Sequence, residues 1–338
     1  MSKYSNMITT IDSHTGGQPT RTILSGLPRL HGNSVTEKML YMEKNLDWVR
    51  MFLTSEPRGT SISSVAVLTE PSDPEADAGV FFYESQGYMP MCGHNTIGVV
   101  TVLIENGMVP VSEPITNLGL ETPNGLIQVR AEIKDGQVKS VAFRNTECFV
   151  YDLDMSVEYK GTTITFDVGF GGNFYAIIPA KSMGIVIEPS RYDEIVKKAQ
   201  DMINIINTKY NVSHPEMKFL KGVTHIQFIQ DLVANQEGFE SKNAVVYMPG
   251  EIDRSPCGTG TSARCAVLHA RGLMKVGDVF TNRSIIDSVF KARIIQEVDY
   301  FGKKAVIPEI TGNAFITGKH MFMLDPNDDK GYGFKLGR

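Results

Sequence analysis

The sequence predicts an α/β (α+β) protein of two pseudo-symmetric halves, each a curved mixed sheet around a central helix. Three observations predict this fold: a duplicated cysteine segment, short strand-like runs throughout, and one apolar helix-like segment after each cysteine. The duplicated segment runs from Cys92 to Gly107 and again from Cys257 to Gly272. With a shift of 165 residues (257 − 92), six of the sixteen positions carry the same residue. Because this shift is close to half of the 338 residues, a duplicated domain is the simplest explanation.

Strand-like runs occur in both halves. Short runs rich in β-branched and aromatic residues, bounded by Gly, Pro, Asn or Asp, predict strands. They cover residues 65–68, 80–83, 126–133, 162–168, 174–178, 244–248 and 288–297. Asn124-Gly125 and Asp135-Gly136 predict hairpin turns, because both residue pairs accept a positive φ.

Two long amphipathic helices are also predicted. The first begins near Ser34, where Ser34 and Glu37 fit a capping box, and it continues past Leu40 to Val49 with apolar residues at helical spacing. The second covers about residues 192–209. Each begins about 60 residues before the cysteine of its half, as two similar halves require.

The segments that follow the two cysteines predict the central helices. Residues 96–104 and 261–270 are apolar on most sides, which is typical of helices enclosed by a sheet rather than lying on a surface. Each segment ends at a glycine, Gly107 or Gly272, in the usual position just beyond a helix C-terminus.

The length of 338 residues exceeds the usual size of one hydrophobic core, so two domains are expected. We place them at residues 1–152 and 153–338, with the C-terminal strands able to return to the first half. The boundary is expected between Cys148 and Val157, where no linker-like tract marks it more closely.

Composition and charge exclude several classes of protein. An apolar content of 42% and a charged content of 21% are typical of a soluble globular chain. The formal net charge of −5 gives no basic excess for binding nucleic acid. Apolar stretches such as residues 98–104 are far shorter than the ~20 residues of a membrane helix. The first residues lack the pattern of a signal peptide, so a cytoplasmic location is expected.

A cysteine at a helix N-terminus is suited to acid/base chemistry. The helix dipole and the unpaired N–H groups stabilise a thiolate, which lowers the thiol pKa from ~8.5 toward neutrality. The glycine after each cysteine lets a carboxylate approach the same N–H groups. Two such helix ends facing each other would hold one carboxylate with a sulfur on each side. Cys92 and Cys257 are therefore the expected proton carriers, and Cys148 and Cys265 are expected to be buried apolar residues.

Two other interpretations of these segments are weaker. Residues 258–263 (GTGTSA) match a dinucleotide-binding fingerprint, but residues 253–256 separate them from the preceding strand, and the partner segment at Cys92 stays unexplained. Cys257 and Cys265 are too widely spaced for the close ligand pairs of a structural zinc site, so no metal is expected.

Residues 91–98 (MCGHNTIG) and 253–261 (DRSPCGTGT) resemble the two signature segments of the proline racemase family. Residues 12–17 (DSHTGG) and 170–174 (FGGNF) add further matches, so the resemblance spans nearly the whole chain. It implies a cofactor-independent enzyme with a fold similar to diaminopimelate epimerase, a homodimer, and a site in the cleft between the halves.

The resemblance also implies roles for single residues. Cys92 and Cys257 would be the two acid/base thiols, and Asp253 would contact the ring nitrogen of an imino acid, where an enclosed ammonium needs a counter-charge. His225 would help to line the site, although a purely structural histidine fits that position nearly as well. The substrate carboxylate would be bound by the backbones of Gly93, His94, Gly258 and Thr259.

The second cysteine separates the activities within the family. Members that dehydrate trans-3-hydroxyproline typically carry threonine there, so Cys257 favours racemisation or epimerisation of proline or 4-hydroxyproline. Asn95 resembles the residue of proline racemases, whereas Gln18 and Gly169 depart from the family's common glutamate and serine. Two alternatives stay open: a trans-3-hydroxy-L-proline dehydratase, and a non-catalytic imino-acid-binding protein that kept the fold and lost the chemistry.

Overall fold

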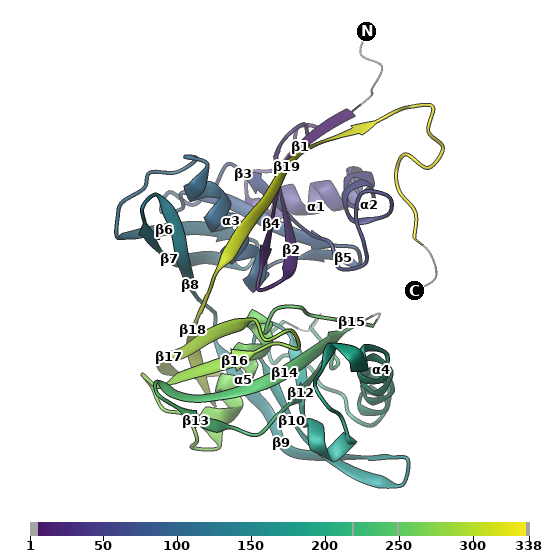
Figure 1. The fold of residues 1–338 in the computed structure, drawn as a ribbon, viewed down its shortest axis with the longest axis vertical. Helices are drawn as coiled ribbons and strands as arrows, with labels where there is room; N and C mark the ends of the chain where they lie inside the picture. The colour runs from purple at the N-terminus through teal and green to yellow at the C-terminus, as the bar shows by residue number, and fades with distance from the viewer. Residues whose placement is uncertain (1–5, 218–219, 249, 336–338) are drawn as a thin grey trace. The chain divides into compact units, whose positions relative to one another are not determined.

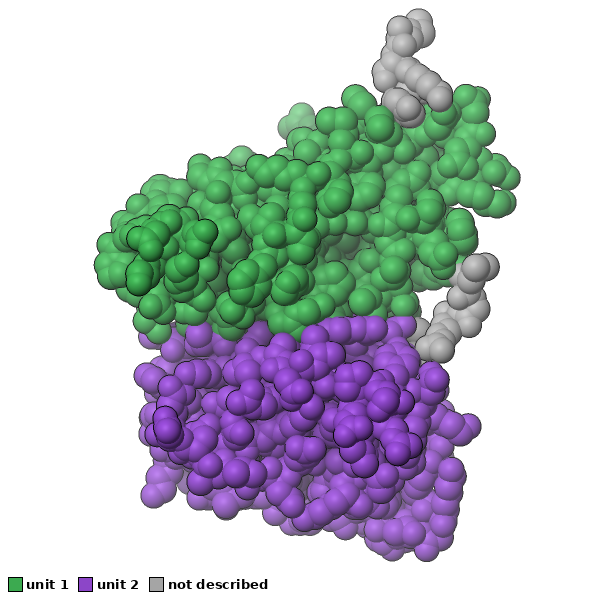
Figure 2. Space-filling view, in the orientation of Figure 1, with its two compact units in different colours: residues 1–143, 312–338 green, residues 144–311 purple. Residues whose placement is uncertain are grey.

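The computed structural model describes residues 6–217, 220–248 and 250–335. The chain divides into two compact units, Met1–Phe143 with Gly312–Arg338, and Arg144–Thr311 (Figure 2). The C-terminal segment belongs to the first unit, and the boundary expected between residues 152 and 153 falls within strand β9 (Cys148–Tyr159).

The first unit is a mixed sheet with three helices (Figure 1). Its elements are β1 (Asn6–Thr15), β2 (Gln18–Ser25), α1 (Val35–Asn45), α2 (Trp48–Thr54), β3 (Ser64–Thr69), β4 (Ala78–Glu84), β5 (Gly87–Met89), α3 (Gly93–Glu105), β6 (Ile115–Thr122), β7 (Gly125–Lys134), β8 (Gln137–Arg144) and β19 (Ala314–Leu324). Within the unit the strands pair in the order β19-β1-β2-β3-β4-β6-β7-β8, with β5 also on β4. The β2–β3 and β4–β6 pairs are parallel and the others antiparallel.

The second unit repeats this composition. Its elements are β9, β10 (Thr162–Phe170), β11 (Phe174–Pro179), the 3-10 helices η1 (Ala180–Met183) and η2 (Pro189–Arg191), α4 (Tyr192–Lys209), β12 (His225–Ile229), β13 (Val233–Asn235), β14 (Gly238–Tyr247), β15 (Glu251–Ile252), α5 (Gly258–Ala270), β16 (Val279–Arg283), β17 (Val289–Tyr300) and β18 (Lys303–Gly312). The strands pair in the order β9-β10-β11-β12-β14-β16-β17-β18, and β18 pairs back to β9, which closes the sheet.

The two units share one order of pairing. Strands β1, β2, β3, β4, β6 and β7 pair with the same alternation of parallel and antiparallel partners as β10, β11, β12, β14, β16 and β17. Helix α3 follows β5 in the first unit, and α5 follows β15 in the second. The expectation of a mixed α/β fold is therefore confirmed, and each cysteine helix occupies the same place in its unit's chain order.

The two cysteine helices are enclosed by their sheets, as their apolar sequences predict. Helix α3 is buried over residues 93–104 and packs on β1, β2, β3 and β19. Helix α5 is buried over most of its length and packs on β9, β10, β11 and β17. Gly107 and Gly272 have φ of 64° and 70° just past the helix ends, and the N–H of the next residue bonds back into the last turn in each case.

Most local predictions match the elements that formed. All seven predicted strand segments fall within or overlap observed strands, and α4 spans residues 192–209 as expected. The Asp135-Gly136 turn joins β7 to β8 with both residues at positive φ. The helix expected from Ser34 to Val49 is in fact two helices, because Leu46 leaves the helical conformation after α1. Ser34 caps α1 as predicted, accepting a hydrogen bond from the Glu37 N–H.

Among the helices in the described ranges, none combines the length and apolar character that crossing a bilayer requires.

Candidate active site

The first candidate site is the N-terminus of α3. Cys92 is the residue before the helix, in an extended conformation with φ of −145°, and only 8% of it is exposed. Its carbonyl accepts hydrogen bonds from the Thr96 N–H and the Thr96 hydroxyl, at 2.9 and 2.8 Å. Thr96, one of the residues shared by the two cysteine segments, thus fixes the helix start that carries the sulfur.

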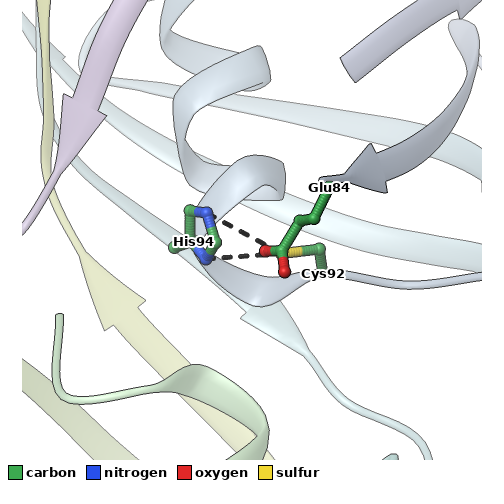
Figure 3. Close-up of side chains that lie close together, drawn as sticks. All are labelled: Glu84, Cys92 and His94. Carbon is green, nitrogen blue, oxygen red and sulfur yellow. Dashed lines mark hydrogen bonds between the residues drawn. The ribbon is translucent and has the colours of Figure 1, made fainter. Parts of the chain in front are cut away.

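His94 lies directly beside the Cys92 sulfur. The Sγ atom is 3.3 Å from Nδ1 and 3.9 Å from Nε2 of the imidazole (Figure 3). The His94 carbonyl accepts a hydrogen bond from the Thr15 hydroxyl at 2.8 Å, which ties the first turn of α3 to β1. Burial lowers the pKa of His94 to about 3, so this imidazole is neutral near pH 7.

Glu84, at the end of β4, completes a cluster with these two side chains. Figure 3 shows its carboxylate turned toward Cys92 and His94. The Asn95 amide donates to the Ser64 hydroxyl at 2.5 Å, and this hydroxyl donates to Glu84 Oε1 at 3.2 Å. A hydrogen-bonded chain from α3 through β3 therefore orients the carboxylate beside the thiol.

The second candidate site is the N-terminus of α5. Cys257 is the residue before this helix and is 7% exposed, but its φ is +66°. That conformation is rare for a residue with a side chain and costs about 1–3 kcal/mol where the surroundings impose it. It turns the sulfur back over the helix, where Sγ accepts a hydrogen bond from the Gly260 N–H at 3.4 Å. Such strain clusters at functional positions.

Two hydroxyl groups surround the Cys257 sulfur. Tyr175 Oη lies 3.4 Å from Sγ and 2.6 Å from the Thr259 hydroxyl, which itself is 3.7 Å from Sγ. Tyr175 comes from β11 and is fully buried. A Cβ on Gly260 would lie 3.1 Å from the Tyr175 ring and 3.2 Å from Cys257 Sγ, so a larger residue there would have to displace these side chains by a few tenths of an ångström.

Asp253 lies in the loop just before Cys257. It is 6% exposed, its carboxylate accepts a hydrogen bond from the Ser255 N–H at 2.7 Å, and the Ser255 hydroxyl accepts one from the Cys257 N–H at 3.1 Å. Burial raises the pKa of Asp253 to about 6. The loop thus holds a carboxylate and a thiol together with little water around either.

The electrostatics at Cys257 differ from the expectation drawn from the helix dipole. Burial, and then the neighbouring Asp253 carboxylate, raise the pKa of Cys257 to about 12. The predicted lowering is therefore wrong for this cysteine, because desolvation and a like charge outweigh the helix end and the hydrogen bonds from Tyr175 and Gly260. Cys257 is a neutral thiol near pH 7.

His225 reaches this site through Tyr175. Their ring centroids are 4.6 Å apart, and the His225 Nδ1 lies 2.8 Å from the Thr224 hydroxyl. Burial lowers the pKa of His225 to about 4, so this ring is also neutral near pH 7. His225 starts β12, which pairs with β11 so that Tyr175 and His225 are register partners.

The glycines of residues 170–174 allow this turn to pack on α5. A Cβ on Gly171 would lie 2.2 Å from the Thr259 carbonyl oxygen and 2.6 Å from Ala263 N, and a Cβ on Gly169 would lie 3.0 Å from the Ala263 carbonyl oxygen. Gly169, which stands where the family commonly has serine, therefore allows β10 to pack closely against α5. The other departure, Gln18, is 1% exposed, and its amide donates to the Ile62 carbonyl at 3.4 Å.

The structure groups the sequence-predicted residues by unit. Cys92, Gly93 and His94 form one helix start, and Asp253, Cys257, Gly258 and Thr259 form the other, with His225 next to Tyr175. Cys148 and Cys265 are fully buried thiols, as expected, and burial raises the pKa of both.

Sequence reasoning missed Glu84, Tyr175 and Ser255. Ser255 lies inside a recognised motif and Tyr175 directly follows another, so their positions were within reach of the sequence. Glu84 directly follows the predicted strand of residues 80–83, eight residues before Cys92 (92 − 84), and only the pairing of β4 with β3 and β5 shows where it points.

Comparison with known proteins identifies the family of this chain. The family model described as "Proline racemase" matches residues 10–335. The chain is 42% identical to a proline racemase of Acetoanaerobium sticklandii, over 99% of this chain and 100% of that one. It is 40% identical to a 4-hydroxyproline 2-epimerase of Streptosporangium roseum, over 96% and 97%. It is 36% identical to a trans-3-hydroxy-L-proline dehydratase of Bacillus cereus, over 99% and 100%.

A solved structure gives the same relationship. A hydroxyproline epimerase from Agrobacterium vitis, with bound trans-4-hydroxy-L-proline, superposes with a TM-score of 0.88 at 35% identity, covering 99% of this chain and 97% of that one. The protein is thus an isomerase of the racemase and epimerase class, and the chain belongs to the proline racemase family.

Proposed function

We propose that this enzyme inverts the α-carbon of proline or 4-hydroxyproline with two cysteines, and without a cofactor. Cys92 and Cys257 exchange protons with opposite faces of the same α-carbon, one as thiolate and the other as thiol. The observation that carries the proposal is the matched position of the two sulfurs. Cys92 directly precedes the enclosed helix α3, which follows β5, and Cys257 directly precedes the enclosed helix α5, which follows β15. The two units have the same order of strand pairing.

The helix starts supply the groups that would bind the substrate carboxylate. In an α-helix the first N–H groups have no partner within the helix, so those of Gly93 and His94, and of Gly258 and Thr259, suit an anion. These donors would also stabilise the negative charge that develops on the carboxylate as the α-proton leaves. Asp253 would hold the ring ammonium, which is the counter-charge that its buried carboxylate needs.

The pKa of about 12 at Cys257 indicates its role in the first proton transfer, where it would be the acid. Near pH 7 Cys257 carries a proton, so in this form it is suited to act as the acid, and Cys92 would be the base for the enantiomer that binds to it. Burial is the main cause of this raised pKa and the Asp253 charge is the second, so an ammonium bound at Asp253 would remove the second contribution and lower the Cys257 pKa toward that needed for the return reaction. Because the pair shares one proton, activity should show a bell-shaped pH dependence that belongs to both groups together.

A deuterium-exchange assay tests this function. The protein is incubated in heavy water with L-proline, trans-4-hydroxy-L-proline or trans-3-hydroxy-L-proline, and optical rotation, α-deuterium and pyrroline formation are followed. Inversion with uptake of deuterium from the first or second substrate supports the proposal. If none of the three exchanges its α-proton, the proposed function is wrong.

The second candidate function is the dehydratase, because one relative with that name matches 99% of this chain. In that reaction one thiol removes the α-proton and the other helps to expel hydroxide. Pyrroline formation from trans-3-hydroxy-L-proline, without inversion of the other two substrates, would favour it. Cys257 argues for the isomerase, since the resemblance implies threonine at that place in dehydratases.

The finer description of the fold and assembly is part of the same proposal. We infer that each chain consists of two duplicated halves with a fold similar to diaminopimelate epimerase. We also infer that two copies of the chain form a homodimer in the cytoplasm. The shared order of strand pairing in the two units supports the duplication. Light scattering of the full chain tests the dimer, since a monomer at all concentrations would contradict it.

A further inference from the structure

The cluster at the start of α3 joins three different metal-binding side chains. Glu84, Cys92 and His94 can each direct one ligand atom to a common point, and these three atoms all lie within 4.8 Å of one another (Figure 3). We propose that this cluster is a site for a thiophilic divalent cation of the zinc type, bound by the Cys92 thiolate, the His94 imidazole and the Glu84 carboxylate. A water molecule would take the fourth position.

The distances suit such an ion. Around a tetrahedral Zn²⁺ with bonds of about 2.0–2.3 Å, neighbouring ligand atoms are roughly 3.4–3.6 Å apart. Cys92 Sγ and His94 Nδ1 are already 3.3 Å apart. The Glu84 carboxylate oxygen lies within 4.8 Å of both atoms, so a small change in its side-chain torsions would bring it to the ion.

The chemistry of the three donors is also suitable. A thiolate and an imidazole are the preferred ligands of Zn²⁺, whereas Mg²⁺ and Ca²⁺ prefer oxygen alone. A neutral imidazole binds such an ion through the lone pair of one ring nitrogen. The Cys92 sulfur binds the ion as thiolate, and any proton that it carries passes to solvent.

The groups around the cluster orient the ligands as metal sites require. Ser64 donates to Glu84 Oε1, and the Asn95 amide donates to Ser64, so the carboxylate is held toward the sulfur. Thr15 fixes the backbone of His94 through its carbonyl. Hydrogen bonds of this kind to a ligand typically change metal affinity by about 10–100-fold.

The cysteine at the start of α5 has no such surroundings. Its neighbours are two hydroxyl groups, of Tyr175 and Thr259, and the Asp253 carboxylate, and no cluster of three ligand types forms there among the described residues. The structure therefore predicts a metal preference for one of the two cysteines. If the proposed function holds, the bound ion also removes Cys92 from proton transfer, so Zn²⁺ inhibits the enzyme.

Cobalt and zinc titrations of the full-length, metal-free protein test the site. With Co²⁺ we expect a thiolate-to-cobalt charge-transfer band that saturates at one ion per chain and is displaced by Zn²⁺. Cys92→Ser should abolish the band, and His94→Ala and Glu84→Gln should weaken Zn²⁺ affinity by about 10–100-fold or more. Cys257→Ser is the matched control and should keep both the band and the affinity. Circular dichroism of each variant checks that it is folded.

The overturning results concern metal binding alone. Absence of the band, or a band that survives in folded Cys92→Ser and is lost in Cys257→Ser, would disprove the site. These readouts need no substrate, so they are independent of whether the enzyme inverts proline. A Zn²⁺ affinity that is equal in wild type and Glu84→Gln would likewise count against the carboxylate as a ligand.

Discussion

The two helix starts have the same sequence pattern and different surroundings. At α3, Cys92 is extended and lies beside a neutral imidazole and the Glu84 carboxylate, whereas at α5, Cys257 has a φ of +66° and lies beside two hydroxyl groups and the Asp253 carboxylate. The difference arises from residues outside the shared positions: His94 stands where the second copy has Thr259, and only the second copy has Asp253 four residues upstream. The two helix starts thus place the sulfur alike, while its surroundings are set by residues that differ between them.

Removing either sulfur should have the largest effect. We expect Cys92→Ser and Cys257→Ser each to lower the rate of inversion by about 10²–10⁴-fold, because positioned acid and base groups contribute that much. The measurement is kcat for both enantiomers, with Cys265→Ala as control for a buried thiol outside the sites. Near-wild-type inversion by either serine variant would contradict the two-base assignment.

Changing Asp253 to Asn should bring the two cysteines closer in reactivity. Without the neighbouring negative charge the pKa of Cys257 falls from about 12, so its alkylation by iodoacetamide at pH 8 should become faster. Mass spectrometry of the labelled cysteines measures this, and Cys92 in the same sample is the internal control. The same variant should raise KM for the imino acid, since the ammonium loses its partner. An unchanged Cys257 alkylation rate would show that Asp253 does not govern this thiol.

Replacing a tightly packed glycine by alanine should lower the free energy of unfolding more at α5 than at α3. Gly171→Ala places a Cβ 2.2 Å from the Thr259 carbonyl oxygen, whereas Gly98→Ala places one 3.0 Å from the Thr20 methyl group. Overpacking of this kind costs about 1–3 kcal/mol, and the rigid backbone neighbour of Gly171 should bring the larger loss. Urea unfolding of both variants gives the two values. A larger loss for Gly98→Ala would reverse the inferred order.

The pH dependence of stability should differ in sign between the sites. Asp253 has a pKa of about 6 when folded against an ordinary 3.8, so its stabilising contribution is present below about pH 4 and is lost as pH rises through 6, by roughly 3 kcal/mol at most. His94 has a pKa of about 3 against an ordinary 6.5, so its contribution is present above pH 6.5 and is lost as pH falls toward 3.

Urea unfolding at pH 4.5 and 7.5 checks both signs. Asp253→Asn should gain more stability over wild type at pH 7.5 than at pH 4.5. His94→Asn should change stability less at pH 4.5 than at pH 7.5, because part of the wild-type contribution is already lost there. Parallel pH profiles in wild type and both variants would mean that neither group titrates differently on folding.

Much of the site could be predicted from the sequence, because the helix starts and ends depend on residues that are close together in the chain. The positions of both cysteines at helix starts follow from the Cys-Gly-x-x-Thr pattern and the apolar residues after it, and the helix ends follow from Gly107 and Gly272. The break after Leu46 was not predicted, because apolar spacing continues across it. Glu84 was missed for a similar reason, since its role depends on strand pairing and not on a pattern of its own.

By itself, the sequence determined the family, the mixed α/β elements and the two sulfurs at helix starts, because propensity, apolar spacing and capping act within a few residues. Only the tertiary structure decided which groups surround each sulfur. Tyr175 reaches Cys257 across 82 residues of chain, and Asn95 reaches Ser64 across 31, through contacts set by the register of the sheets. The pKa of Cys257 follows from that burial and from Asp253, so a helix start alone could not give it.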